Sequence, residues 1–457
     1  MTTPREYARE HRTGFVEELK TFLRIPSIST LSEHAADVRR AAEWLAEQMR
    51  LVGIQHVELV ETGGHPIVYG EWLGAGPEAP TVVVYGHYDV QPVDPLDEWK
   101  TPPFEPTIIG ENIYARGATD DKGQLFIHLK AAEAYLKTVG RLPVNIKYIF
   151  EGEEEVGSVH LDTFIAENRE RLAASSAIIS DTHMLGPDTP SIVYGLRGLA
   201  YIEVTVQGPR NDLHSGLYGG AVDNPALVLA RMLAQLHDEH GRVTIPGFYD
   251  AVRPLTPEER ENLARVPYGE EELKAETGVP AAWGEAEYSI VERIGARPTL
   301  DVNGMWAGFT GEGAKTIIPA RASAKISMRL VPDQDPDDIA QRAVAYLQDL
   351  APPTVTFSAK TLHGGKPALI PLDSVPMQAA AAAFETVWGK RPIFTREGGS
   401  IPVVATFMDV LGAPPVMLGF GLGDDNLHAP NEKFYLPNFY RGIETVIEYL
   451  RLLAEMS

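Results

Sequence analysis

Short segments rich in apolar residues constrain the fold of this chain more than any other feature. Residues 82–85 (VVVY) form an uninterrupted apolar run, and residues 145–150 (NIKYIF) and 176–181 (SAIISD) are further predicted strands. Such runs are typical of strands that are buried on both faces, as in a parallel sheet covered by helices. Between them, residues 124–136 place apolar side chains at helical spacing. The alternation predicts an α/β fold with a mostly parallel sheet and helices on both faces.

The pattern changes after residue 196. Residues 199–208 (LAYIEVTVQG) and 315–332 alternate apolar and polar side chains, as half-solvated antiparallel strands do. Helical periodicity resumes after Pro371. We therefore expect a discontinuous α/β domain of residues 1–196 and 371–457, interrupted by an inserted α+β domain of residues 197–370.

Composition excludes several classes of protein. The chain has 40 Lys and Arg against 63 Asp and Glu, a net charge of −23, so a nucleic-acid partner is not expected. It has no cysteine, which excludes disulfides, thiol nucleophiles and sulfur-ligated zinc, so any metal must be held by His and carboxylates. Neither a signal-like segment nor an apolar run of about 18 residues occurs, so we expect a cytoplasmic protein without a membrane partner.

Histidine and acidic side chains follow the predicted strands, where the ligands of parallel sheets bind. Asp89, two residues beyond His87, can hold one ring nitrogen of that histidine and leave the other for a metal. Each segment alone would also suit a solvated turn or loop. Their shared position instead predicts a two-metal hydrolase centre, in which cations offset the crowded acids. The candidates at strand ends are His87, Asp120, Glu154 or Glu155, Asp181 and His428.

The segments around these residues resemble the carnosinase-like metallodipeptidases. This family belongs to a wider group with aminoacylase, carboxypeptidase G-type enzymes and succinyl-diaminopimelate desuccinylase. The resemblance runs from about residue 85 to 435 in family order. It is carried by VYGHYDVQP, ARGATDDKGQ, EGEEEVGS, DLHSGLYGG, AKTIIPA, REGGSIP and LHAPNEKF.

The resemblance assigns metal ligands. It implies that His87 and Asp181 hold one metal, that Glu155 and His428 hold the other, and that Asp120 bridges the two, with a cis peptide bond after Asp120. Two divalent ions are therefore expected, and zinc or manganese suits nitrogen and oxygen ligands.

The resemblance also implies catalytic and substrate-binding roles. Asp89 would orient His87, and Glu154 would be the general base that deprotonates a metal-bridging water. His214 would act across a homodimer to polarise the scissile carbonyl, which makes the inserted domain a lid and dimerisation domain. Glu153 and His183 fall outside the family pattern. The expected substrate contacts are His214, Thr316, Arg329, Gly399 and Ser400.

The predicted function is hydrolysis of the peptide bond of dipeptides or other small carboxylate-bearing substrates. Two alternatives stay open. One is a deacylase or carboxypeptidase acting on N-acyl amino acids, which would use the same metal core. The other is a non-catalytic peptide-binding protein built on the same scaffold.

Overall fold

The chain divides into two compact units. The computed structural model describes residues 2–399 and 401–457. The first unit comprises the chain up to Tyr194 together with Ile370–Phe394 and Val403–Ser457. The second unit comprises Gly195–Leu369, and the later segment Thr395–Pro402 groups with it.

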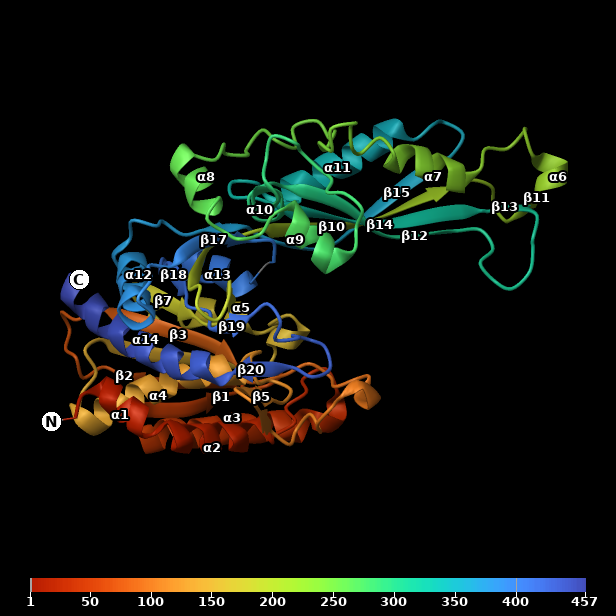
Figure 1. Ribbon diagram of the computed structural model, residues 1–457. Coiled ribbons are helices and arrows are strands. Elements are labelled where there is room, and N and C mark those ends of the chain that lie inside the picture. The colour runs from red at the N-terminus through yellow and green to blue at the C-terminus, as the bar shows by residue number, and fades with distance from the viewer. Residues whose placement is uncertain (1, 400) are drawn as a thin grey trace. The chain divides into compact units, whose positions relative to one another are not determined.

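The main sheet has the strand order β1-β2-β6-β3-β7-β18-β9-β16, and β17 also pairs with β9. Figure 1 labels its strands β1, β2, β3, β7, β17 and β18. Strand β3 runs parallel to β6 and β7, and β7 runs parallel to β18, whereas the outer pairs are antiparallel. The expected parallel sheet is thus confirmed at its centre, and its edges make it a mixed sheet. The strands are β1 (Gln55–Val60), β2 (Ile67–Trp72), β3 (Thr81–His87), β6 (Asn145–Glu151), β7 (Ser176–Ile179), β9 (Ser191–Leu196), β16 (Ala368–Leu369), β17 (Ile393–Glu397) and β18 (Pro415–Met417).

Two small sheets accompany the main sheet. One has the order β20-β5-β4 and the other pairs β19 with β8. Their strands are β4 (Thr107–Ile109), β5 (Asn112–Tyr114), β8 (His183–Met184), β19 (Gly421–Leu422) and β20 (Lys433–Tyr435).

Helical segments cover both faces of the main sheet, as expected. Neighbouring residues of a strand point to opposite faces. In β3, the ring of Tyr85 meets Phe407 edge-on, whereas a Cβ on Gly86 would lie 3.1 Å from Cβ of Leu125 in α4. Glycine at this position therefore lets α4 approach the sheet. The α-helices of the first unit are α1 (Pro4–Glu10), α2 (Arg12–Leu23), α3 (Ala35–Val52), α4 (Lys122–Thr138), α5 (Leu161–Glu167), α12 (Val375–Trp388), α13 (Pro402–Thr406) and α14 (Leu436–Met456). The 3-10 helices η1 (Ser32–His34), η2 (Leu96–Glu98) and η3 (Glu154–Val156) and the π-helix η4 (Phe407–Leu411) accompany them.

The second unit is built on an antiparallel sheet of order β12-β14-β10-β15. Buried and half-exposed residues alternate along β10, and α7 and α11 pack against the sheet to form the core. Its strands are β10 (Gly198–Gln207), β11 (Leu213–His214), β12 (Thr299–Ala307), β13 (Ile317–Ile318), β14 (Arg321–Leu330) and β15 (Thr356–Gly365). Its helices are α6 (Ser215–Tyr218), α7 (Pro225–Leu233), α8 (Pro257–Leu263), α9 (Glu270–Thr277), α10 (Ile290–Gly295) and α11 (Pro336–Leu350). Among the described residues of both units, no helix combines the length and apolar character needed to span a bilayer.

Candidate metal centre

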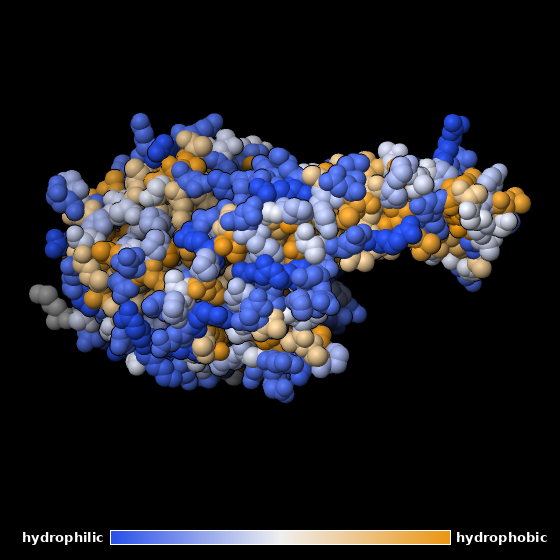
Figure 2. All heavy atoms as spheres, turned by 90° about the horizontal axis from the view of Figure 1, so that it is seen from above, coloured by the Kyte–Doolittle hydropathy of each residue, from blue (hydrophilic) through white to orange (hydrophobic). Residues whose placement is uncertain are grey.

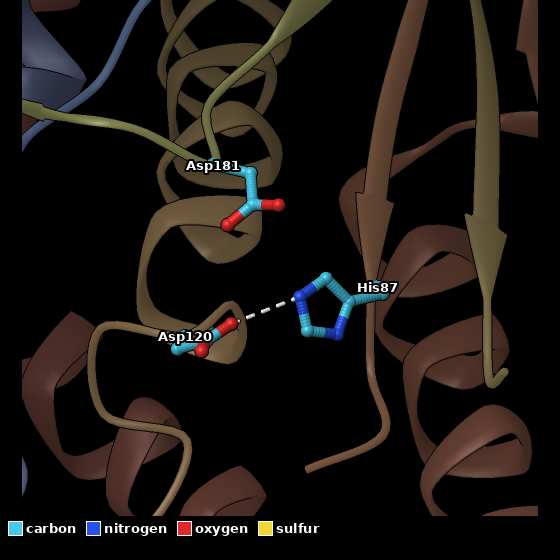
Figure 3. Close-up of side chains that lie close together, drawn as sticks. All are labelled: His87, Asp120 and Asp181. Carbon is cyan, nitrogen blue, oxygen red and sulfur yellow. Dashed lines mark hydrogen bonds and ion pairs between the residues drawn. The ribbon is translucent and has the colours of Figure 1, made fainter. Parts of the chain in front are cut away.

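Two groups of potential metal ligands share one carboxylate, that of Asp120. The first group is His87, Asp120 and Asp181, and the second is Asp120, Glu155 and His428. Within each group the donor atoms all lie within 4.8 Å of one another. Oδ1 of Asp120 is 3.1 Å from Nε2 of His87, and Oδ2 is 2.9 Å from Nε2 of His428. Figure 3 shows the side chains of the first group converging on a common space. One carboxylate between two ligand groups is the arrangement that a pair of cations requires.

Three of these ligands come from neighbouring parallel strands. His87 is the last residue of β3, and Asp181 lies two residues beyond β7. Glu155 belongs to η3, which follows β6. Because β3 lies between β6 and β7 and runs parallel to both, the carboxyl ends of the strands meet at one edge of the sheet.

Asp120 and His428 reach the centre from loops. Asp120 lies between β5 and α4, and its peptide bond to Asp121 is cis, as the resemblance implied. His428 lies between β19 and β20, with a left-handed φ of +58°. The structure brings both residues to the other potential ligands. Asp120 was expected at a strand end, but it lies in the loop before α4, six residues beyond the end of β5.

Burial and mutual repulsion perturb the charge states of these ligands. Burial, assisted by the charge of Asp120, raises the pKa of Glu155 to about 8 and that of Asp181 well above its usual range. Burial also opposes ionisation of Asp120, but hydrogen bonds from the two histidines hold its pKa below the usual value. The hydrogen bond to Asp120 in turn raises the pKa of His428 to about 9.

The donor set suits divalent cations. It offers two imidazoles and three carboxylates and no sulfur, which fits zinc and also manganese. Within residues 2–399 and 401–457, Oε1 of Glu155 is a buried oxygen without a hydrogen-bond partner. Cations at this place would satisfy that oxygen and would replace the protons that the crowded carboxylates otherwise retain.

Asp89 connects His87 to the segment that carries Glu154 and Glu155. Nδ1 of His87 is 3.2 Å from the main-chain oxygen of Asp89 and 3.4 Å from its carboxylate. That carboxylate accepts hydrogen bonds from the backbone N–H groups of Glu154 at 3.3 Å and Glu155 at 3.1 Å.

Sequence reasoning missed Gln91, whose Nε2 donates to Oε2 of Glu155 at 2.6 Å. Its position two residues beyond Asp89 continues the spacing of His87 and Asp89, and this signal could have identified it.

Neither Glu153 nor His183, the two nearby residues outside the family pattern, is a member of either ligand group. Glu153 contacts Nδ1 of His160 at 2.7 Å and accepts a hydrogen bond from the backbone of His65 at 3.1 Å. His183 is exposed in β8.

Among the expected substrate contacts, the structure brings His214 and Thr316 together. His214 is exposed at the end of β11 and pairs with Ile317 of β13. The backbone N–H of the next residue, Ser215, donates to the carbonyl of Thr316 at 3.1 Å. Both side chains therefore belong to one two-stranded ribbon of the second unit.

The other expected contacts are spread over the second unit. Arg329 is half-buried in β14. Burial, assisted by the charge of Arg329, lowers the pKa of Arg197 to about 10. Sequence reasoning did not single out Arg197, although it stands in the YGLRG segment where the pattern changes. Gly399 follows β17, and Ser400 lies outside the described residues.

Comparison with known proteins gives consistent matches. A model of peptidase family M20/M25/M40 matches residues 83–452. The chain is 36% identical to the Cys-Gly metallodipeptidase DUG1 of Candida albicans, over 96% of this chain and 95% of that protein. It is 30% identical to the human Beta-Ala-His dipeptidase, over 99% of this chain and 92% of that protein. Among solved structures, it is similar to the metallo-carboxypeptidase Sso-CP2 of Sulfolobus solfataricus, with 38% identity, a TM-score of 0.83, and 96% and 99% of the two chains covered.

Proposed function

This chain belongs to peptidase family M20/M25/M40 and is a metallodipeptidase, and we propose that it cleaves dipeptides at a centre of two divalent cations. The observation that carries the two-cation proposal is Asp120, which belongs to both ligand groups. His87 and Asp181 would complete one site, and Glu155 and His428 the other. Zinc and manganese both fit these ligands.

Glu154 is proposed as the general base. When bound, the two cations would lower the pKa of water and polarise the scissile carbonyl. Glu154 stands beside Glu155 at the start of η3, and Asp89 holds the backbone of both residues. Its carboxylate would take a proton from the attacking water and return it to the leaving amine. Burial raises the pKa of Glu154, which brings it closer to the range in which a carboxylate both accepts and returns a proton.

The second unit is proposed to recognise the substrate. Arg329 would bind the C-terminal carboxylate, since a guanidinium can form two parallel hydrogen bonds with it. Thr316, Gly399 and Ser400 would make further contacts to that end of the substrate, and His214 would donate to the carbonyl oxygen as charge develops on it. These assignments rest on the family resemblance: its motifs contain His214, Thr316, Gly399 and Ser400, whereas Arg329 lies outside the quoted motifs.

A homodimer is part of this proposal, because the family motif around His214 implies action across a subunit interface. Hydrophobic side chains lie exposed over α6 and α7 (Figure 2), and β12 is an edge strand with exposed apolar residues. Unpaired edge strands and large exposed apolar patches are typical of interaction surfaces. The exposed side chains on these elements are Leu217, Tyr218, Leu227, Val302, Met305 and Trp306, and Phe309 follows β12. Analytical ultracentrifugation should give about twice the mass of 50.0 kDa.

A substrate panel tests the proposed activity. Metal-depleted protein would be restored with zinc or manganese and assayed on Cys-Gly, β-Ala-His, tripeptides and N-acetyl amino acids. The first two are the substrates named for the relatives, so the panel also addresses side-chain preference. We expect metal-dependent cleavage of dipeptides and little cleavage of the other two classes.

A carboxypeptidase is the second candidate, and the similarity to Sso-CP2 favours it. Release of the C-terminal residue from tripeptides and N-acyl amino acids, at rates equal to those for dipeptides, would support it over the dipeptidase. Metal-dependent turnover of any of these substrates would exclude a binding protein without catalysis.

A further inference from the structure

Glu432 is a buried carboxylate that accepts four hydrogen bonds. Oε2 accepts from Nη1 of Arg116 at 2.9 Å and from the backbone N–H of Gly117 at 2.9 Å. Oε1 accepts from the backbone N–H groups of Thr119 at 3.0 Å and Asp120 at 3.1 Å. The residue is 0% exposed. One side chain therefore organises the backbone of the loop that ends in Asp120.

The same residue stands in the segment that carries His428. Its carbonyl accepts a hydrogen bond from the backbone of Ala115 at 3.1 Å. The next residue, Lys433, pairs with Tyr114 of β5. Glu432 thus joins the two loops from which Asp120 and His428 approach each other to 2.9 Å.

Arg116 makes this anchor rigid. Its side chain is buried, donates to the carbonyl of Pro92 at 2.9 Å, and lies 5.3 Å from the ring centroid of Trp99. Glu432 also satisfies three backbone N–H groups of the ligand loop, which would otherwise be buried without an acceptor.

We propose that Glu432 is a positioning residue for the metal centre: it fixes Asp120 so that its two oxygens face His87 and His428. The inference rests on the two-cation centre proposed above. Residues that orient metal ligands typically contribute 10–100-fold to metal affinity.

The substitution Glu432→Gln tests this role. Glutamine has one acceptor oxygen and one amide NH₂, so in either orientation the NH₂ faces two donors of the loop. We expect the metal-free variant to bind Zn²⁺ about 10–100-fold more weakly than wild type, measured by competition with a chromogenic chelator. Glu432→Asp keeps the charge beside Arg116 but falls one methylene short, so it should fold and should also bind Zn²⁺ more weakly.

A matched control separates positioning from stability. Glu444 in α14 is also buried, and it accepts hydrogen bonds from Arg5, Arg9 and Arg12. In the part of the chain that the structure describes, these side-chain partners belong to α1 and α2 and not to the loops that carry Asp120 and His428. Glu444→Gln should lower the stability of the fold and leave Zn²⁺ affinity unchanged.

The outcomes are distinguishable. Wild-type Zn²⁺ affinity in both Glu432 variants, or an equal loss in Glu444→Gln, would overturn the positioning role while leaving the metal centre in place. If wild-type protein does not bind two Zn²⁺ ions, the proposed centre fails, and this inference fails with it.

Discussion

Metal-free protein should lose stability as the pH rises from about 4.5 to about 8, and bound metal should remove that loss. Burial beside Asp120 raises the pKa of Glu155 to about 8, whereas an unfolded glutamate titrates near 4.5. Between these values the native state retains a proton that the unfolded state has lost. The stability that this proton contributes is fully present below about pH 4.5 and disappears as the pH approaches 8.

The magnitude follows from the gap between the two pKa values. The gap is about 3.5 pH units, and at about 1.4 kcal/mol per unit it sets an upper limit of about 5 kcal/mol for Glu155. Burial raises the pKa of Glu151 to about 8 as well, which acts in the same direction. The carboxylates repel one another and therefore titrate as a coupled group, so their individual contributions do not add. We expect the free energy of unfolding to fall by a few kcal/mol in total.

Chemical unfolding of chelator-treated protein between pH 5 and 8.5 measures this effect. With excess zinc, the loss of stability at rising pH should vanish or reverse, because metal binding requires deprotonated ligands. Glu155→Gln removes one titrating group and should flatten the profile of the metal-free protein. Equal stability of metal-free wild type at pH 5 and pH 8 would refute the reasoning, because it would mean that the carboxylates are not crowded in a buried site.

Three further predictions concern catalysis and packing. Glu154→Gln should abolish dipeptide turnover while Zn²⁺ stoichiometry stays at the wild-type value, and near-normal turnover would exclude Glu154 as the base. His214→Ala should lower kcat by on the order of 10²–10³ with unchanged metal content in steady-state assays, and a loss of metal instead would contradict its role at the carbonyl. Gly86→Ala should destabilise the first unit by about 1–3 kcal/mol in urea unfolding, since its Cβ would lie 2.8 Å from Oδ2 of Asp121 and 3.1 Å from Cβ of Leu125. Wild-type stability of this variant would show that α4 can shift away from β3.

The strand pattern predicts His87, Asp181 and either Glu154 or Glu155 as candidate ligands, and the family resemblance selects Glu155. His87, Glu155 and Asp181 follow apolar runs, and three parallel neighbouring strands bring the ends of such runs together. The sequence does not reveal the antiparallel edges of the sheet, because an apolar run has the same appearance in either direction. The match to the family model and the central parallel strands support the predicted fold class.

The remaining features depend on contacts that are distant in the chain. The backbone N–H of Asp120 donates a hydrogen bond to the buried carboxylate of Glu432. In the sequence, Glu432 has the same appearance as a glutamate on a solvated surface. The segment Thr395–Pro402 follows residues of the first unit in the chain but groups with the second. Neither local periodicity nor composition encodes such long-range packing. The roles of His214 and Arg329 came from the family resemblance and stay predictions.

Anomalous diffraction from zinc-soaked crystals tests the central claim most directly. We predict two zinc peaks on either side of the Asp120 carboxylate, one beside His87 and Asp181 and the other beside Glu155 and His428. A single peak, or peaks that do not share Asp120, would contradict it.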